Sequence, residues 1–229
     1  MANKRNKGTK KQQHPMMIIA GILVVLVLGV LGIQVPSELQ SFLGLDTTPV
    51  EQSQPSSNSA ANGASENPGP EELGKSSFTD SELKNSSKGW ITYHELDSLG
   101  RATGADALLK PAMVNTGTSA NQSIRPPGFI SGKEPYDHSR GHLIGRQLGG
   151  TGDDARNLTT LYQTPVNAPY MTKYENQIRK AMDDGETIRY RVTPIYEGSD
   201  LLCQSIEMEA KGLDKNSTID FHVRIINEK

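Results

Sequence analysis

An uncharged apolar run of 18 residues, MMIIAGILVVLVLGVLGI, occupies positions 16 to 33 and separates residues 1–15 from the rest of the chain. As a helix rising about 1.5 Å per residue, it can cross most of a hydrocarbon core about 30 Å thick. Five lysines and arginines and no acidic residue precede it, which favours a cytoplasmic N-terminus. We therefore expect a basic cytoplasmic tail over residues 1–15 and a transmembrane anchor over residues 16–33.

A cleaved signal peptide is the competing interpretation, because it too has a basic start and an apolar centre. Its apolar region is usually about 7 to 15 residues long and is followed by a small-x-small cleavage site. The run here is longer, and the following QVPSE offers no convincing site. The expected location is thus the cell membrane, with a single pass and an extracellular C-terminal domain. Secretion after cleavage is the alternative.

The residues after the anchor are expected to form a flexible extracellular linker over 34–77. From residue 46 onward this stretch is rich in Ser, Asn, Pro, Gly and Glu and has almost no large apolar groups. Such a composition cannot bury enough surface to offset the entropy lost on folding. Folded structure is therefore expected over residues 78–229, a length near the commonest domain size.

Charge and cysteine content narrow the function classes only slightly. From residue 70 onward the chain has 19 basic and 22 acidic residues, whereas a non-specific nucleic-acid binder ordinarily has a basic excess. Arginines of the central third of the chain could still form a local positive cleft. The single cysteine, Cys203, excludes an internal disulfide and is expected to occupy a packed core position.

Hydrophobic periodicity and turn residues predict an α+β domain with an antiparallel C-terminal meander. Residues 95–109 are ambiguous between extended and helical structure, and residues 124–132 are turn-rich with at most a short strand. A helix is predicted from Asn167, an expected N-cap, to Met182, because apolar residues recur there at helical spacing. Strands are predicted over residues 90–93, 157–161, 187–196, 201–210 and 218–226.

The segment YDHSRGHLIGRQLGG, residues 136 to 150, contains two of the five histidines together with arginines and glycines. A two-histidine zinc clip would place His138 and His142 on one helix face, but the residues between them disfavour a helix, and the zincin glutamate is absent. In an extended segment Arg140 and His142 lie on the same face. This pairing suits a phosphodiester, because arginine can hold a phosphate oxygen while histidine activates water. Gly141 is expected to allow close approach of the substrate backbone.

Further motifs follow in order, since RGHLIGRQLGG is succeeded by ARNLTT and then by NAPYMTKYEN. Together with the upstream ELDSLGRATGADALL, they resemble the DNA/RNA non-specific endonuclease family with the ββα-metal fold. Within that family they are similar to bacterial nucleases of DNA uptake and to streptococcal-type secreted nucleases. The resemblance covers nearly all of residues 90–226. It implies a ββα-metal nuclease core within the α+β domain.

The resemblance also implies roles for individual residues. His142 is the expected general base, Asn167 the protein ligand of a Mg²⁺ ion otherwise held by waters, and Glu175 a carboxylate that orients a water bound to that ion. Arg140 corresponds to the motif arginine and Asn157 to an earlier asparagine near the site. One amide oxygen suits Mg²⁺, which keeps most of its waters, and Mn²⁺ is the alternative ion. Independently of the resemblance, the candidate phosphate contacts are Arg125, Arg146 and Arg156.

Two positions depart from the family pattern. Ser139 stands where the family has aspartate, with Asp137 nearby as a candidate substitute, and Asn167 follows Asn157 by ten positions, one more than the pattern. The resulting expectation is a metal-dependent, largely sequence-non-specific endonuclease of DNA, with RNA as a second substrate. A cell-surface protein that binds nucleic acid during uptake without cutting it is the alternative, which Ser139 and the acidic balance leave open.

Overall fold

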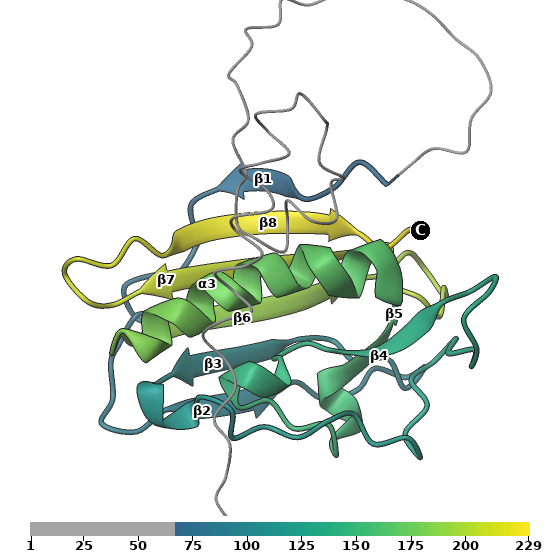
Figure 1. Cartoon of the computed structure of the whole chain (residues 1–229), viewed down its shortest axis with the longest axis horizontal. Helices are drawn as coiled ribbons and strands as arrows, with labels where there is room; N and C mark the ends of the chain where they lie inside the picture. Colours follow the sequence, from purple (N-terminus) through teal and green to yellow (C-terminus); the bar gives the residue numbers. More distant parts are fainter. Residues whose placement is uncertain (1–66) are drawn as a thin grey trace, which may run out of the picture. The chain divides into compact units, whose positions relative to one another are not determined.

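The computed structural model describes residues 67–229, which form one six-stranded antiparallel sheet, one two-stranded ribbon and one long helix (Figure 1). The predicted α+β class is therefore confirmed. The tail over 1–15, the anchor over 16–33 and the linker before residue 67 lie outside the described residues. Among residues 67–229, no helix has the length and apolar character needed to cross a membrane.

The six-stranded sheet has the order β1-β8-β7-β6-β3-β2, with antiparallel neighbours throughout. The predicted C-terminal meander is confirmed as β6-β7-β8, and the ambiguous segment contains a strand, β3. Four of the five β3 residues are fully buried, so its sequence lacks the alternation that would have distinguished it from a helix. The strands are β1 (Glu71–Gly74), β2 (Trp90–Tyr93), β3 (Ala105–Leu109), β6 (Ile188–Ile195), β7 (Ser205–Gly212) and β8 (Asp220–Ile226).

The edge strand β1 lies within the range predicted as flexible linker, so the fold begins before residue 78. All four of its residues are exposed, and it is held by backbone pairing with β8. Flanking polar side chains add to this: Asn67 Nδ2 donates to Ile226 O at 2.9 Å, and Ser77 N and Oγ donate to Glu209 Oε2 at 2.7 Å. A composition poor in apolar residues does not reveal order of this kind, because no apolar burial produces it.

Helix α3 (Thr172–Asp183) lies across one face of this sheet (Figure 1). Its buried side chains are Tyr174, Ile178, Ala181 and Met182, at the predicted spacing. The Tyr174 ring packs against Phe221 of β8 with centroids 5.2 Å apart. Each large side chain buried in this layer contributes about 1.5–3 kcal/mol to folding.

The predicted helix start at Asn167 is wrong, because α3 begins only at Thr172. The segment before it, η4 (Gln163–Met171), is a wide π-type turn with non-helical backbone at Thr164 (φ −121°, ψ 128°) and Ala168 (φ −143°, ψ 127°). Both residues directly precede prolines, and the residue before a proline is excluded from helical backbone by contact with the ring. Asn167 is therefore not the N-cap of α3.

The two-stranded ribbon consists of β4 (His138–His142) and β5 (Leu158–Tyr162), which pair from His138↔Tyr162 to His142↔Leu158. The strand predicted over 157–161 is thus confirmed with a one-residue offset. Gly141 was expected to allow close approach of a substrate backbone, and this is wrong. A Cβ at this position would lie 2.4 Å from Leu161 Cδ1, so a side chain of β5 occupies the space beside Gly141. In chain order β4, β5 and α3 form a ββα unit.

The remaining segments are short turns and loops. Residues 124–132 contain no strand, and Cys203 lies just ahead of β7, where it is 2% exposed. Burial raises the pKa of the Cys203 thiol to about 12, which disfavours thiol chemistry. The 3₁₀ turns are η1 (Pro111–Met113), η2 (Arg146–Leu148) and η3 (Ala155–Asn157).

Candidate active site

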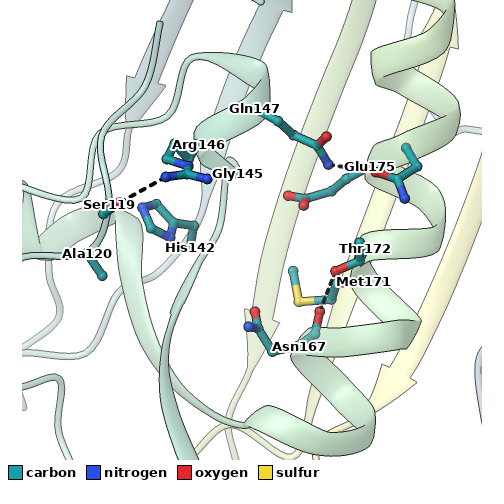
Figure 2. Close-up of a pocket in the computed structure, with 11 residues that line it drawn as sticks. Ser119, Ala120, His142, Gly145, Arg146, Gln147, Asn167, Met171, Thr172 and Glu175 are labelled. Atoms are coloured by element: carbon teal, nitrogen blue, oxygen red, sulfur yellow. Dashed lines mark hydrogen bonds between the residues drawn. The ribbon is translucent and has the colours of Figure 1, made fainter. Parts of the chain in front are cut away.

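A cavity of about 460 Å³ lies where β4, η2, η4 and α3 meet (Figure 2). His142 reaches it from the end of β4, Asn167 from η4 and Glu175 from the first turn of α3. The structure therefore brings together three residues that were singled out from the sequence. The other lining residues are Ser119, Ala120, Gly145, Arg146, Gln147, Met171, Thr172 and Asn176.

The imidazole of His142 is held in one orientation by a backbone carbonyl. His142 Nε2 lies 3.0 Å from Thr118 O, and because a carbonyl only accepts hydrogen bonds, Nε2 carries the hydrogen and Nδ1 is free to accept a proton. Burial lowers the pKa of His142, and the positive charge of Arg146 lowers it further, although the Thr118 carbonyl acts in the opposite direction. The side chain is thus neutral at pH 7 and suited to act as a base.

The Glu175 carboxylate approaches the cavity over a glycine. A Cβ on Gly145 would lie 2.2 Å from Glu175 Oε1, so any larger residue at position 145 would displace the carboxylate. Burial raises the pKa of Glu175 to about 7, although the Gln147 side chain and the Gly145 backbone favour the charged form. Gln147 is itself oriented by donating from Nε2 to Asn176 Oδ1 at 3.1 Å. Sequence reasoning missed both Gly145 and Gln147.

Asn167 presents an amide oxygen to the same cavity. Its Nδ2 donates to Gln163 Oε1 at 3.0 Å, and its backbone carbonyl accepts from Thr172 Oγ1 at 2.9 Å. Within residues 67–229, no group donates a hydrogen bond to Asn167 Oδ1. This oxygen is therefore available to a cation or to the substrate.

The donor set limits which metal ion the cavity could hold. Residues 67–229 contain no group of three or more His, Cys, Asp or Glu side chains placed to bind a metal. A cation here would depend on the Asn167 oxygen, the nearby Glu175 carboxylate, waters and substrate oxygens. Such an oxygen-rich, water-rich shell fits Mg²⁺ and not the closed nitrogen and sulfur shell of a structural zinc site.

Arg140 lies on the same face of β4 as His142, but its guanidinium is not among the groups that line the cavity. Nε donates to Ile124 O at 2.6 Å and Nη2 donates to Gln122 O at 3.0 Å. The guanidinium also lies 4.2 Å over the ring of Phe129. Arg140 therefore ties the loop over residues 122–129 to β4, which differs from the phosphate contact expected for it.

Asn157 is fully buried and also lies outside the cavity lining. Its Oδ1 accepts from Ile144 N at 2.9 Å, and its Nδ2 donates to Ile144 O at 3.1 Å and Thr151 O at 2.8 Å. These contacts hold the loop over residues 144–151, which carries Gly145. The structure thus places Asn157 near the site, as the resemblance implies, where it supports this loop from outside the cavity lining.

The three candidate phosphate arginines are placed differently. Arg146 lines the cavity, and its Nη1 donates to Ser119 Oγ at 3.1 Å (Figure 2). Arg156 is engaged by carboxylates, at 2.8 Å from Asp154 and 2.9 Å from Glu95. Arg125 lies on the loop over residues 122–129, away from the cavity lining. Only Arg146 is therefore placed to meet a phosphate in the cavity.

Ser139 points away from His142. Its Oγ donates to Leu161 O at 3.3 Å, on the opposite face of β4 from the imidazole. Asp137 immediately precedes β4, at the end of the strand opposite to His142, and does not line the cavity. The substitution at position 139 therefore changes a contact within the ribbon, and Asp137 does not replace the missing aspartate.

The sequence reasoning also missed the segment that supplies the Thr118 carbonyl. Thr118 N donates to Gly150 O at 3.1 Å and Asn121 N donates to Gly152 O at 2.9 Å, which fixes this segment against the loop after η2. A Cβ on Gly152 would lie only 2.1 Å from Ser119 O. The dense glycines near residue 150 were the one signal, because they mark a place where two backbones approach closely.

A ββα unit that brings a histidine, an amide oxygen and a carboxylate to one cavity fits the class of ββα nucleases. Residues 81–213 match the DNA/RNA non-specific endonuclease family, and the chain belongs to this family. The resemblance seen in its motifs is thereby confirmed.

Two solved structures share the fold at low sequence identity. NucA from Streptococcus agalactiae, with a magnesium ion bound, is 23% identical with a TM-score of 0.60, covering 72% of this chain and 83% of its own. The Sda1 nuclease, with a zinc ion bound, is 20% identical with a TM-score of 0.59, covering 69% of this chain and 90% of its own.

Proposed function

We propose that this protein is a metal-dependent, largely sequence-non-specific endonuclease that hydrolyses phosphodiester bonds of DNA, with RNA as a second substrate. Membership of the nuclease family supports phosphodiester hydrolysis. The observation that carries the proposal is the convergence of His142, Asn167 and Glu175 on one cavity. The proposed contact of Arg146 is to the phosphate backbone, and contacts of that kind carry little sequence information.

His142 acts as the general base. Nδ1 takes a proton from a water molecule, whose oxygen forms a bond to phosphorus as the phosphorus–oxygen bond to the leaving nucleotide breaks. The leaving oxygen is protonated by solvent. The Thr118 carbonyl, 3.0 Å from Nε2, stabilises the imidazolium formed in this step. Arg146 holds a non-bridging phosphate oxygen, since its guanidinium lines the cavity beside His142.

Asn167 is the residue that would hold a divalent cation, Mg²⁺ or alternatively Mn²⁺, and Glu175 would orient a water molecule bound to it. When bound, the cation would offset the negative charge that develops at the phosphate. The magnesium ion in NucA and the zinc ion in Sda1 support metal dependence. Arg140 and Asn157 act indirectly, by holding the loops over residues 122–129 and 144–151 in place.

The proposed location is the cell membrane, with residues 16–33 as a single-pass anchor and the nuclease domain outside the cell. The basic residues before the apolar run support this orientation. Fractionation of cells that express the full-length chain is expected to place it in the membrane pellet, with the domain accessible to added protease. Recovery of a shortened chain from the medium would instead indicate secretion after cleavage.

Cleavage of supercoiled plasmid by the full-length chain tests the proposed activity. Nicking is expected in Mg²⁺, with complete loss in excess chelator and a decrease of about 10²- to 10⁴-fold in His142→Ala. His94→Gln is the matched control, because His94 pairs with Asp106 at 2.8 Å and does not line the cavity. Full activity in His142→Ala would contradict the mechanism. Plasmid that is bound but intact with and without chelator would favour the non-catalytic alternative.

A further inference from the structure

An aromatic cluster surrounds the start of β4, at the end of the strand opposite to His142. It consists of Phe129, Tyr136, His138 and Tyr162. The ring centroid of His138 lies 5.6 Å from that of Tyr136, 5.2 Å from that of Tyr162 and 6.4 Å from that of Phe129. The role proposed for the cavity does not involve these rings.

One ring of this cluster, that of Tyr136, is exposed to solvent. Tyr162 and His138 are half-buried and hold the ribbon together, but Tyr136 is 44% exposed. Tyr136 and Trp90 are the two aromatic side chains among the exposed large hydrophobic residues of the described range. An exposed ring has a free face on which another planar group can stack.

Two arginines give the cluster positive charge. The guanidinium carbons of Arg140 and Arg125 lie 4.2 and 5.3 Å from the centroid of the Phe129 ring. Arg140 is occupied by the carbonyls of Gln122 and Ile124, whereas Arg125 is exposed and makes only long hydrogen bonds of 3.3 and 3.4 Å. An exposed ring and an exposed arginine are elements that bind single-stranded nucleic acid, whose bases stack while the phosphates pair with the cation.

The cluster and the cavity lie at opposite ends of β4. His138 and His142 are the two ends of β4, about 13 Å apart at about 3.3 Å per residue. Ser119, which lines the cavity, belongs to the same stretch of chain that leads to Phe129. A nucleic-acid strand that leaves the cavity along β4 would therefore reach His138, beside Tyr136, about four nucleotides from the bond being cut, at about 3.4 Å per nucleotide.

We infer that Tyr136 and Arg125 stack and hold unpaired bases that flank the scissile phosphodiester, so that the protein prefers single-stranded or locally unpaired nucleic acid to duplex. This inference rests on the proposed nuclease function and specifies its substrate class. Bases within a duplex are already stacked and paired, and they offer no free face to the cluster.

Steady-state cleavage by the full-length chain of a single-stranded oligonucleotide and of a duplex with the same sequence tests the preference. The wild-type protein is expected to have a lower KM for the single strand. Tyr136→Leu, which keeps apolar bulk without a stacking face, is expected to raise that KM about five- to tenfold and to reduce the preference. Tyr136→Phe should retain it, because the ring is kept. Trp90→Leu is the matched control on the distant edge strand β2.

Equal KM values for both substrates in the wild-type protein, or an unchanged preference in Tyr136→Leu, would overturn the inference. Lack of cleavage of either substrate would contradict the proposed function alone. In that case, fluorescence anisotropy with the same oligonucleotides in chelator still tests the cluster. Weaker binding of the single strand by Tyr136→Leu than by Tyr136→Phe supports the inference, and equal binding overturns it.

Discussion

The charge on His142 is set by its burial and by Arg146, and this makes the pH dependence of cleavage predictable. Both effects lower its pKa from the ordinary value of 6.5. Because the base must be unprotonated, kcat/KM is expected to rise with pH through a pKa below 6.5 as His142 loses its proton. Arg146→Gln removes the neighbouring positive charge and should move the acid limb to higher pH. Profiles of kcat/KM between about pH 4.5 and 8 measure the acid limb of the wild-type protein and of the variant. An acid limb at the same pH in both proteins would show that Arg146 does not lower the pKa of His142.

The absence of a side chain at Gly145 allows the Glu175 carboxylate to occupy its position in the cavity. Gly145→Ala would place a Cβ 2.2 Å from Glu175 Oε1, so the carboxylate must move and plasmid cleavage is expected to fall by at least about tenfold. The control is a double-mutant cycle with Glu175→Ala. If displacement of the carboxylate is the cause, the double variant should be no less active than Glu175→Ala alone. Additive losses would show that Gly145→Ala acts by another route.

At the level of elements, the β4–β5 ribbon depends on the absence of a side chain at Gly141. Gly141→Ala would place a Cβ 2.4 Å from Leu161 Cδ1, and overpacking of this kind costs about 1–3 kcal/mol of unfolding free energy. Urea unfolding measures the loss. Because Leu161→Ala removes the clashing atoms, the double variant should lose less stability than the sum of the two single variants. A strictly additive result would place the strain elsewhere.

At the level of the whole molecule, Asp106 connects β3 with the neighbouring strand β6 and with His94, which directly follows β2. It accepts hydrogen bonds from Arg189, from Arg191 Nε at 3.1 Å and from His94 Nε2 at 2.8 Å. Burial raises its pKa, but the Arg189 hydrogen bond and charge outweigh burial, and the pKa is lowered below its ordinary value of 3.8. A lowered pKa means that this carboxylate stabilises the fold above about pH 4, and that the stabilisation is lost as the pH falls through the folded-state pKa.

Asp106→Asn is therefore expected to lower the unfolding free energy at pH 7 by about 1–3 kcal/mol. The variant lacks a carboxylate whose protonation destabilises the fold. It should therefore also lose less stability than the wild-type protein between about pH 5 and 2. Urea unfolding at several pH values checks both expectations. Parallel curves for the two proteins would show that Asp106 does not contribute to acid sensitivity.

The sequence alone predicted those features that depend on the types of side chain within a short stretch of chain. The spacing of apolar residues predicted α3 and the three C-terminal strands, because the periods of 3.6 and 2 are local properties of backbone geometry. The order of the motifs also singled out His142, Asn167 and Glu175 before any contact between them was known. Hydrophobic pattern did not decide β3, which is buried on both faces, nor the break before α3, where two prolines interrupt an apolar pattern.

Only the tertiary structure decided which backbones meet. The Thr118 carbonyl that fixes the His142 tautomer, the carbonyls that occupy Arg140 and the backbone groups that surround Asn157 all come from distant segments. Backbone amides and carbonyls are the same in every residue, so residue type does not encode their partners. The requirement for glycine at position 145 was likewise not predictable from local sequence, because it arises only when Glu175 packs against Gly145.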